Sequence, residues 1–322
     1  MDKKNIMSER IHLLDPSIAT KNLGDFIILD AVRSCLKTLF PQARFFNSPT
    51  HDAIGRASYA LNKECDFSFV GGTNLLSSNM NAYNQWKVNA YDALFLKDII
   101  LMGVGWWQYQ KGVNFYTSML YKSLLSGEIL HSVRDSYTRQ KLSEAGIHNC
   151  INTGCPTTWK LTPEHCEYIP RLKSDSVVFT LTDYKKNPTA DSMLLRTLSK
   201  SYDNLFFWPQ GSKDLDYLQS LPYSLEVLSP SLESFDSLLR DSESIDYVGT
   251  RLHAGIRALQ YKRRSIIIGV DNRAAEIAKD INLPFVAREK ISDLAQIIAG
   301  DWATSLTVDF ASIEAWRAQF IR

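Results

Sequence analysis

The sequence lacks any long hydrophobic run. Its longest apolar stretch, Ile99 to Trp107, contains two glycines and falls far short of the roughly 20 residues that a membrane-spanning helix needs. The amino terminus, MDKKNIMSER, is polar and no apolar core follows it, so no secretory signal is expected. These two absences predict a cytoplasmic protein.

Cysteine is scarce and has no metal-binding spacing. Five cysteines in 322 residues are an odd number, which argues against a disulfide scaffold and fits a reducing compartment. Cys150, Cys155, His165 and Cys166 lie close together in sequence, but they contain no CxxC pair and match no usual zinc pattern. Buried or surface thiols are the preferred interpretation, and no metal is expected.

An excess of charge of one sign is also missing. The 36 Lys+Arg and 35 Asp+Glu leave a formal charge of +1, so we expect no nucleic-acid partner and no binding driven by bulk charge. Hydrophobic residues make up 45% and charged residues 22%, ordinary values that exclude disorder as the dominant state. At about 150 residues per domain, the length predicts two domains.

What the sequence does contain is a regular alternation of short apolar runs and amphipathic segments. In the carboxyl-terminal half the runs read as strands, and short helical patterns separate them; the strands are at 177–181, 205–208, 225–228, 245–248, 265–270 and 284–286. The amino-terminal half repeats this less regularly, with strands at 11–14, 44–46, 66–70, 99–102 and 129–133. Strands that read as buried on both faces, joined by short connections, predict parallel, doubly wound sheets.

The predicted fold class is therefore α/β, with two Rossmann-like doubly wound domains and a cleft between them. Residues 1–160 form the first domain and residues 175–308 the second. The stretch 157–174, with two prolines and mixed charges, reads as the linker. The tail, residues 309–322, reads as a helix that could cross between the domains.

The most informative candidate site is Gly249-Thr250-Arg251-Leu252-His253, because ligands of parallel sheets bind beyond the carboxyl ends of the strands. Thr250 could cap the next helix, whose free N–H groups favour an anion. Arg251 could grip a carboxylate or phosphate with two hydrogen bonds, and His253 suits proton transfer near neutrality. A surface arginine and a packed histidine at an ordinary helix start remain the alternative.

Other candidates also follow strands. Arg134 follows the strand at 129–133, and Arg273 follows the apolar strand at 265–270. Gly71-Gly72 would let a ligand approach the backbone closely, although a plain turn explains the two glycines equally well. No Walker loop, nucleophile elbow or HExxH motif is present.

Four of these motifs resemble those of the polysaccharide pyruvyltransferases, over nearly the whole chain. Asn22-Leu23-Gly24-Asp25 resembles the N-x-G-D motif of the family, and Phe69–Leu75 resembles its strand and glycine-rich loop. Val133-Arg134-Asp135-Ser136 is similar to the R-D segment, and Gly249–Ala254 to the R-L-H-A motif. The chain departs from the family in a shorter glycine loop, in Ser136 where proline is common, and in Arg273 where lysine is frequent.

The resemblance implies a GT-B-like arrangement of the two domains and a pyruvyltransferase activity. The pyruvyl group would move from phosphoenolpyruvate to sugar hydroxyls of a cell-surface polysaccharide or its lipid-linked precursor, forming a ketal and releasing phosphate. Phosphoenolpyruvate is a co-substrate, so no cofactor is implied. A lipid-linked oligosaccharide acceptor would bring the enzyme into peripheral contact with the inner membrane surface.

The resemblance also assigns roles to residues. His253 and Arg251 would be catalytic; the donor site would comprise Arg134, Thr250, Arg251, His253 and Arg273. The amino-terminal domain would face the acceptor through Asn22, Asp25, Gly71, Gly72 and Asn74. Two alternatives stay open: a GT-B glycosyltransferase that uses a nucleotide-sugar donor, and a non-catalytic protein that binds a glycan or an anion.

Overall fold

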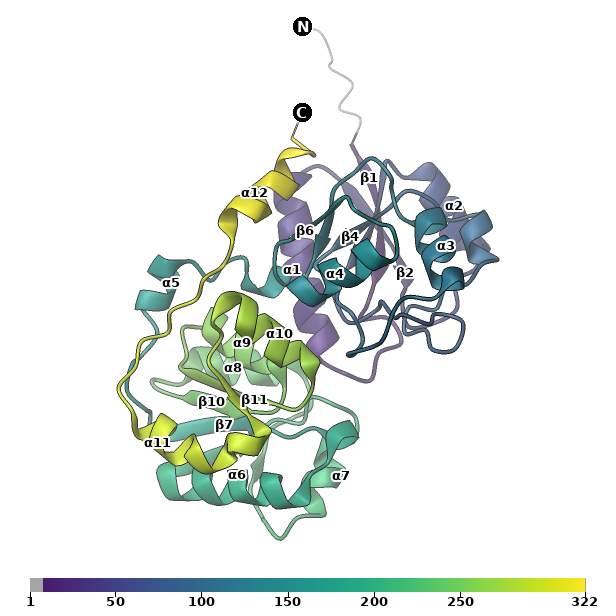
Figure 1. Cartoon of the computed structure of the whole chain (residues 1–322). Helices are drawn as coiled ribbons and strands as arrows, with labels where there is room; N and C mark the ends of the chain where they lie inside the picture. The colour runs from purple at the N-terminus through teal and green to yellow at the C-terminus, as the bar shows by residue number, and fades with distance from the viewer. Residues whose placement is uncertain (1–7, 322) are drawn as a thin grey trace, which may run out of the picture. The chain divides into compact units, whose positions relative to one another are not determined.

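The computed structural model describes residues 8–321, and the chain divides into two compact units (Figure 1). Within the described range, unit 1 comprises the residues up to Thr20, Ile28–Pro156 and the residues from Asp309 on; unit 2 comprises Lys21–Ile27 and Thr157–Val308. The segment Lys21–Ile27 therefore groups with the second unit, although the predicted boundary placed it in the first domain. The predicted GT-B-like arrangement and its cleft stay a prediction.

Unit 1 is built on parallel strands, as predicted. A four-stranded sheet has the order β2-β1-β3-β4, and a parallel pair β5-β6 lies beside β4 through a bridge between Val104 and Val133. The strands are β1 Arg10–Asp15, β2 Arg44–Pro49, β3 Phe67–Gly71, β4 Ile99–Met102, β5 His131–Val133 and β6 Cys150–Asn152. No strand was predicted at the position of β6, which has only three residues.

Helices between these strands, and one helix from the tail of the chain, pack in unit 1. They are α1 Gly24–Leu39, α2 Arg56–Glu64, α3 Phe115–Leu124, α4 Ser136–Glu144 and the tail helix α12 Phe310–Ala318, with a short 3-10 turn, η1, at Asp92–Leu94. The tail is fixed to unit 1 by aromatic contacts: the Phe320 ring lies 5.4 Å from Phe69 and 5.6 Å from Phe67. The tail thus belongs to unit 1 by its packing.

Unit 2 contains one fully parallel six-stranded sheet with the order β12-β11-β10-β7-β8-β9. The strands are β7 Ser176–Thr180, β8 Asn204–Phe207, β9 Glu226–Val227, β10 Asp246–Gly249, β11 Ser265–Gly269 and β12 Phe285–Ala287. This is the 3-2-1-4-5-6 order of the Rossmann fold, whose direction reverses between the first and fourth strands, here β7 and β10. The predicted Rossmann-like α/β class is confirmed for this unit.

Helices cover both faces of this sheet, with α9 and α10 on one side and α6 and α11 on the other (Figure 1). The helices are α5 Pro163–Glu167, α6 Pro188–Ser201, α7 Asp214–Gln219, α8 Leu232–Asp241, α9 Leu252–Gln260, α10 Asn272–Ile281 and α11 Leu294–Ala299, with 3-10 turns η3 Asp183–Lys185 and η4 Arg288–Asp293. Local sequence sets their starts: the Asn187 side chain accepts from the N–H of Ala190, and Pro188 follows at the first helical position.

The prediction of a linker over 157–174 was wrong. The stretch contains α5 and groups with unit 2. Thr157 and Leu161 are fully buried, and the His165 side chain contacts the Leu259 carbonyl at 2.8 Å. Its prolines serve local structure instead, since Pro163 starts α5 after the Thr162 cap.

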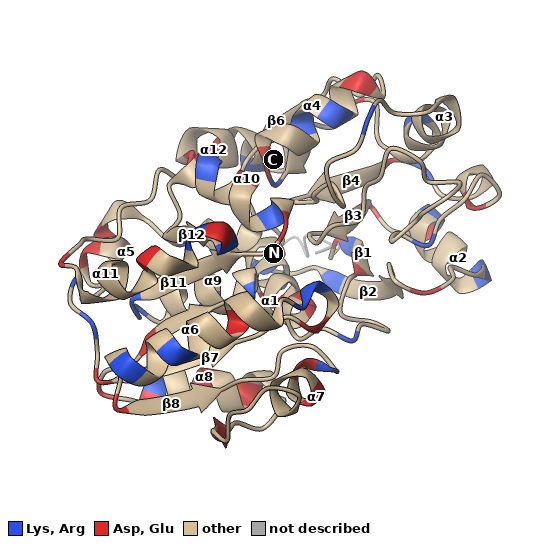
Figure 2. Cartoon of the chain, turned by 60° about the horizontal axis from the view of Figure 1, so that its bottom comes forward, with Lys and Arg blue, Asp and Glu red and all other residues tan. Residues whose placement is uncertain are grey.

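The charged residues are interspersed along both units (Figure 2). Among residues 8–321, no helix has both the length and the apolar character to cross a membrane.

Candidate functional site

The candidate site of unit 2 lies where the strand order reverses. β7 and β10 pair in parallel, with Thr180 opposite Gly249, so the residues that follow these two strands emerge at the same edge of the sheet. Leu181 to Asp183 follow β7, and Thr250 to His253 follow β10. Parallel sheets bind ligands at such an edge.

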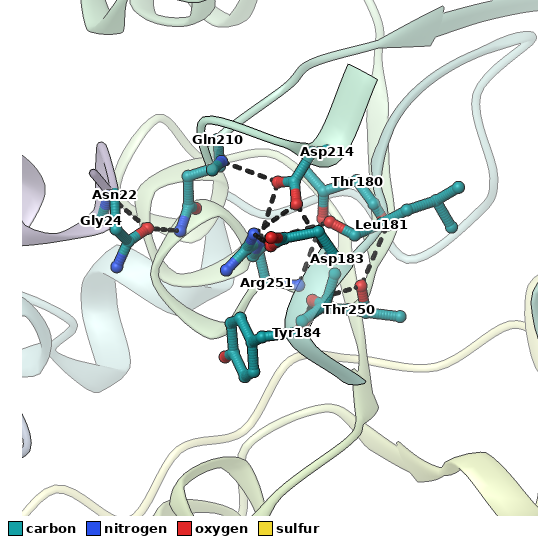
Figure 3. A network of polar contacts seen from close by, with 12 residues as sticks. Asn22, Gly24, Thr180, Leu181, Asp183, Tyr184, Gln210, Asp214, Thr250 and Arg251 are labelled. Carbon is teal, nitrogen blue, oxygen red and sulfur yellow. Dashed lines mark hydrogen bonds and ion pairs between the residues drawn. The ribbon is translucent and has the colours of Figure 1, made fainter. Parts of the chain in front are cut away.

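Arg251 is the central side chain of this edge, and its guanidinium is buried, with 4% exposed. Its Nε donates to Asp214 Oδ2 at 3.0 Å and to the Leu181 carbonyl at 3.2 Å, and its Nη2 donates to Asp214 and, at 3.0 Å, to Asp183. Figure 3 shows Arg251 between these two carboxylates and the ring of Tyr184. The sequence predicts this arginine and also indicates Asp183, which follows the strand at 177–181, but it does not indicate Asp214.

Asp214, at the start of α7, is a site residue that the sequence analysis did not identify. Its side chain is fully buried and also accepts the backbone N–H groups of Gly211 and Asp183, at 2.7 and 3.0 Å. Burial raises the pKa of Asp214, and Arg251 opposes that rise by favouring the carboxylate. A Cβ on Gly211 would lie 2.2 Å from Arg251 Nη2, so only glycine leaves room for this pair.

Thr250 does not cap the following helix, contrary to the prediction. The N-cap residue of α9 is Arg251, and no side chain caps this helix start. The Thr250 hydroxyl instead contacts the Thr182 hydroxyl at 2.8 Å and the Thr180 carbonyl at 3.3 Å. These two contacts of the Thr250 hydroxyl join the end of β10 to the end of β7.

Arg273 joins the same edge through Tyr184. Its Nε donates to Asp271 at 3.0 Å, and its Nη2 donates to the Tyr184 hydroxyl. The Tyr184 ring lies 5.0 Å from the Arg251 guanidinium and 5.7 Å from that of Arg273. Burial alone would lower the pKa of Arg273, but Asp271 and Tyr184 raise it above its ordinary value, so this side chain stays charged.

The segment that carries Asn22 and Asp25 packs against unit 2 rather than forming part of the amino-terminal unit. The Gln210 side chain donates to Asn22 Oδ1 at 2.7 Å (Figure 3). The Leu23 N–H donates to the Gln210 carbonyl at 2.9 Å. A Cβ on Gly24 would lie 2.8 Å from Gln210 Nε2. The N-x-G-D motif is thus held to the loop after β8, which places Asn22 and Asp25 in the unit that contains Arg251.

Gln210 was not a predicted site residue, whereas Asn272 belongs to the Asp271-Asn272-Arg273 segment expected after the strand at 265–270. Gln210 Oε1 and Asn272 Oδ1 are buried acceptor atoms without a hydrogen-bond partner among residues 8–321. Gln210 neighbours Gly211, and Asn272 neighbours Arg273. Buried acceptors without a partner are costly, so each could receive a hydrogen bond from a ligand.

Unit 1 brings together two other predicted residues, Arg134 and Asn74. Arg134 follows β5 and is 1% exposed; its Nη2 donates to Asn74 Oδ1, and its Nε lies 3.4 Å from Asp135. A Cβ on Gly105 would lie 2.2 Å from Arg134 Nη2, so this glycine makes room for the arginine. The predicted donor residues therefore fall in both units, with Arg134 in unit 1 and Thr250, Arg251, His253 and Arg273 in unit 2.

Backbone conformation and packing account for glycine at positions 71 and 72. Gly72 adopts φ +63°, which glycine tolerates best, and a Cβ there would lie 2.2 Å from Ile28 of α1. A Cβ on Gly71 would lie 3.0 Å from Val32 of the same helix. Close packing of α1 on the end of β3 requires both small residues, whatever ligand they face.

His253 is the second residue of α9 and is 5% exposed. It shares this helix start with Arg251. The two residues with the strongest prediction from sequence are therefore buried at one helix start, at the carboxyl edge of the sheet. A fixed cation and an imidazole at one helix start suit a reaction of an anionic substrate that includes a proton transfer.

The chain resembles known proteins at two levels. The family model described as polysaccharide pyruvyl transferase matches residues 22–272. A solved structure of the wall teichoic acid polymerase TagF, in its H548A form, is 12% identical with a TM-score of 0.40 and covers 99% of this chain and 84% of that one. The structure of LpCGTa in complex with UDP is 11% identical, with a TM-score of 0.40, over 98% of this chain and 95% of that one. Comparison with curated proteins gives no match.

The family match includes all four motifs, from the segment at Asn22 to the helix start at His253. Because the family match covers most of the chain, this protein belongs to the polysaccharide pyruvyl transferase family.

Proposed function

We propose that this protein transfers a pyruvyl group from phosphoenolpyruvate to two hydroxyls of a sugar, in a cell-surface polysaccharide or its lipid-linked precursor, and releases phosphate. Membership of the family supports an enzyme that modifies polysaccharide. The observation that carries the finer proposal is a pair of fixed arginines at the carboxyl edge of the unit 2 sheet: Arg251 at the switch point, and Arg273, which follows β11 and donates to Tyr184. Phosphoenolpyruvate carries a carboxylate and a phosphate, which suit two such cations.

The contacts of Arg251 indicate how it would receive the donor. Among the described residues, every hydrogen bond of its guanidinium uses Nε or Nη2, so Nη1 is the nitrogen that would face a ligand. Asp214, fully buried, would stay in place and orient the guanidinium. Asp183, whose side chain is 20% exposed and makes one contact with Arg251, is the partner that the donor carboxylate would replace.

The proposed reaction balances without a further co-reactant. A sugar hydroxyl adds its oxygen to C2 of phosphoenolpyruvate while C3 gains a proton and becomes a methyl group. The oxygen of a second hydroxyl then bonds to C2 as the C2–O bond to phosphate breaks, and its proton leaves with the phosphate. His253 would supply the proton to C3 and take up the proton that the first hydroxyl releases, so it ends the step protonated as it began; imidazole exchanges protons near neutral pH.

The buried acceptor atoms support a substrate that carries hydroxyls. Gln210 Oε1 and Asn272 Oδ1 need a hydrogen-bond donor. A sugar has many O–H donors, whereas phosphoenolpyruvate is mainly an acceptor of hydrogen bonds. The acceptor sugar would therefore approach unit 2 beside Asn22 and Asp25; the other predicted acceptor residues, Gly71, Gly72 and Asn74, belong to unit 1. We infer a cytoplasmic site of action.

Incubation with phosphoenolpyruvate and an isolated lipid-linked glycan tests the proposal. We expect phosphate release together with a glycan that gains a pyruvyl ketal. Release of a nucleotide from a nucleotide-sugar donor would instead establish a glycosyltransferase, and binding without either product a non-catalytic protein.

The variant His253→Gln tests whether His253 supplies the proton. Because loss of a positioned acid typically costs roughly 10² to 10⁴ in rate, we expect turnover to fall by about that factor while donor affinity stays near the wild-type value. Near-normal turnover would contradict the acid role of His253.

A further inference from the structure

Exposed apolar side chains concentrate in two segments of unit 1, residues 83–97 and 111–125. Of the sixteen large hydrophobic residues that are exposed in the described chain, six lie in these segments: Tyr83, Tyr91, Leu94, Phe95, Phe115 and Met119. Phe115 is the most exposed of all, at 82%, and Leu94 and Tyr91 follow at 66% and 63% within this group. Scattered exposed hydrophobics are ordinary, but a contiguous group marks an interaction surface.

The two segments form one surface. The turn η1 packs on α3, and the backbone N–H of Ala90 donates to the Tyr116 hydroxyl of α3 at 3.0 Å. Phe115 and Met119 are four residues apart and share one side of this helix. We name the surface made by Tyr91, Leu94, Phe95, Phe115 and Met119 the η1–α3 face.

Lysines outnumber acidic residues around the η1–α3 face, although the exposed Asp98 directly follows Lys97. The same two segments carry four exposed lysines and a single acidic residue; the lysines are Lys87, Lys97, Lys111 and Lys122. The acidic residue, Asp92, is 4% exposed and accepts the Tyr59 hydroxyl at 2.7 Å and the Asn89 N–H at 2.8 Å. This local excess contrasts with the formal charge of +1 for the chain.

We propose that the η1–α3 face docks on an anionic membrane surface. Aromatic and leucine side chains at helix ends enter the boundary between headgroups and acyl chains, and lysines around them attract anionic lipid. Exposed tyrosine and phenylalanine in segments that also carry four exposed lysines fit this boundary better than a protein interface, whose core is depleted of lysine.

A neighbouring groove of about 660 Å³ is not part of this proposal. Leu94, Phe95, Lys63 and Lys97 line it, but so do Asp66 and Asp98. Its charges therefore balance, and it offers no preference for an anion.

Vesicle flotation of the full chain tests the docking. Vesicles of phosphatidylcholine with about 30% phosphatidylglycerol should carry the protein up the gradient, and vesicles of pure phosphatidylcholine should not, since each lysine near an anionic surface adds to binding. Raising the salt from 50 to 500 mM should release the protein, because added salt screens this attraction.

Leu94→Ser should bind these vesicles about tenfold more weakly, because the serine cannot bury an apolar side chain in the bilayer. The matched control is Leu172→Ser in unit 2, whose leucine is 63% exposed against 66% for Leu94. Equal binding of the two variants, or no flotation of the wild type, would overturn the proposal. So would a protein that self-associates through Leu94 and ignores vesicles, since the face would then bind a second copy.

This inference goes beyond the proposed reaction and does not depend on the donor. Phosphate release with a water-soluble acceptor should be the same for Leu94→Ser as for the wild type. A failed docking test would therefore leave the pyruvyl transfer standing, and a failed transfer assay would leave the docking standing.

Discussion

Replacing Asp214 by asparagine should destabilise unit 2 strongly, because it removes the carboxylate that faces the buried guanidinium of Arg251. The two side chains are 0% and 4% exposed, so solvent screens the pair little. Removing one partner of a buried ion pair costs about 3–5 kcal/mol. Asp183, 3.0 Å from Arg251 Nη2, still offsets part of the charge, so we expect about 3 kcal/mol for Asp214→Asn.

Urea unfolding followed by circular dichroism measures this loss, with Asp301→Asn as the control. Arg171 and Asp301 form an ion pair at 2.7 Å whose side chains are 62% and 58% exposed, and such a pair contributes about 0–1 kcal/mol. If Asp214→Asn does not fold, the double variant Asp214→Leu with Arg251→Met should recover folding, because it leaves no unpaired charge. A loss for Asp214→Asn as small as that for Asp301→Asn would refute the reasoning.

Three further predictions follow from unit 1 and the site. Burial lowers the pKa of His12 and of His131 to about 4, against 6.5 for the ordinary side chain. Between pH 4 and 6.5 each of these histidines binds more protons in the unfolded chain than in the folded protein. The free energy of unfolding should therefore fall by about 1.4 kcal/mol per pH unit for each histidine as the pH drops through this range. A free energy of unfolding from urea titrations that does not change between pH 6.5 and 4 would contradict this. Gly211→Ala should displace Arg251 and weaken phosphoenolpyruvate binding measured by calorimetry, since its Cβ would meet Nη2 at 2.2 Å; unchanged affinity would argue against Arg251 at the donor site. Gly72→Ala should lower the melting temperature, because its Cβ would meet Ile28 at 2.2 Å and φ is +63°, whereas Gly112→Ala, with open space around it, should be nearly neutral.

Much of the fold could be predicted because its strands are local apolar runs. The run at 265–270 contains three consecutive isoleucines, and β11 forms at Ser265–Gly269. β6 and α5 were not predicted because neither contains an apolar run: β6 is Cys-Ile-Asn, and α5 is Pro-Glu-His-Cys-Glu. The placement of Lys21–Ile27 escaped because it depends on contacts with Gln210, 188 residues further along the chain.

The site could be predicted only where a motif marks it. Arg251 and His253 stand in a recognisable run after a strand, and the structure puts both at the carboxyl edge of the unit 2 sheet. Asp214 and Gln210 carry no such motif, and only the tertiary fold brings them to Arg251 and Asn22. The signal that could have found them is their position after β8, at the same edge of the sheet.

The binding of phosphoenolpyruvate to this protein is the most direct test of the central claim, that the Arg251 edge of unit 2 holds this donor. A ligand at 100 times its dissociation constant stabilises the folded protein by about 2.7 kcal/mol, which a thermal melt resolves. We predict that phosphoenolpyruvate raises the melting temperature of the wild type and has a much smaller effect on Arg251→Lys, because an ammonium cannot replace the forked guanidinium. A melting temperature that responds to a nucleotide sugar and not to saturating phosphoenolpyruvate would contradict the account.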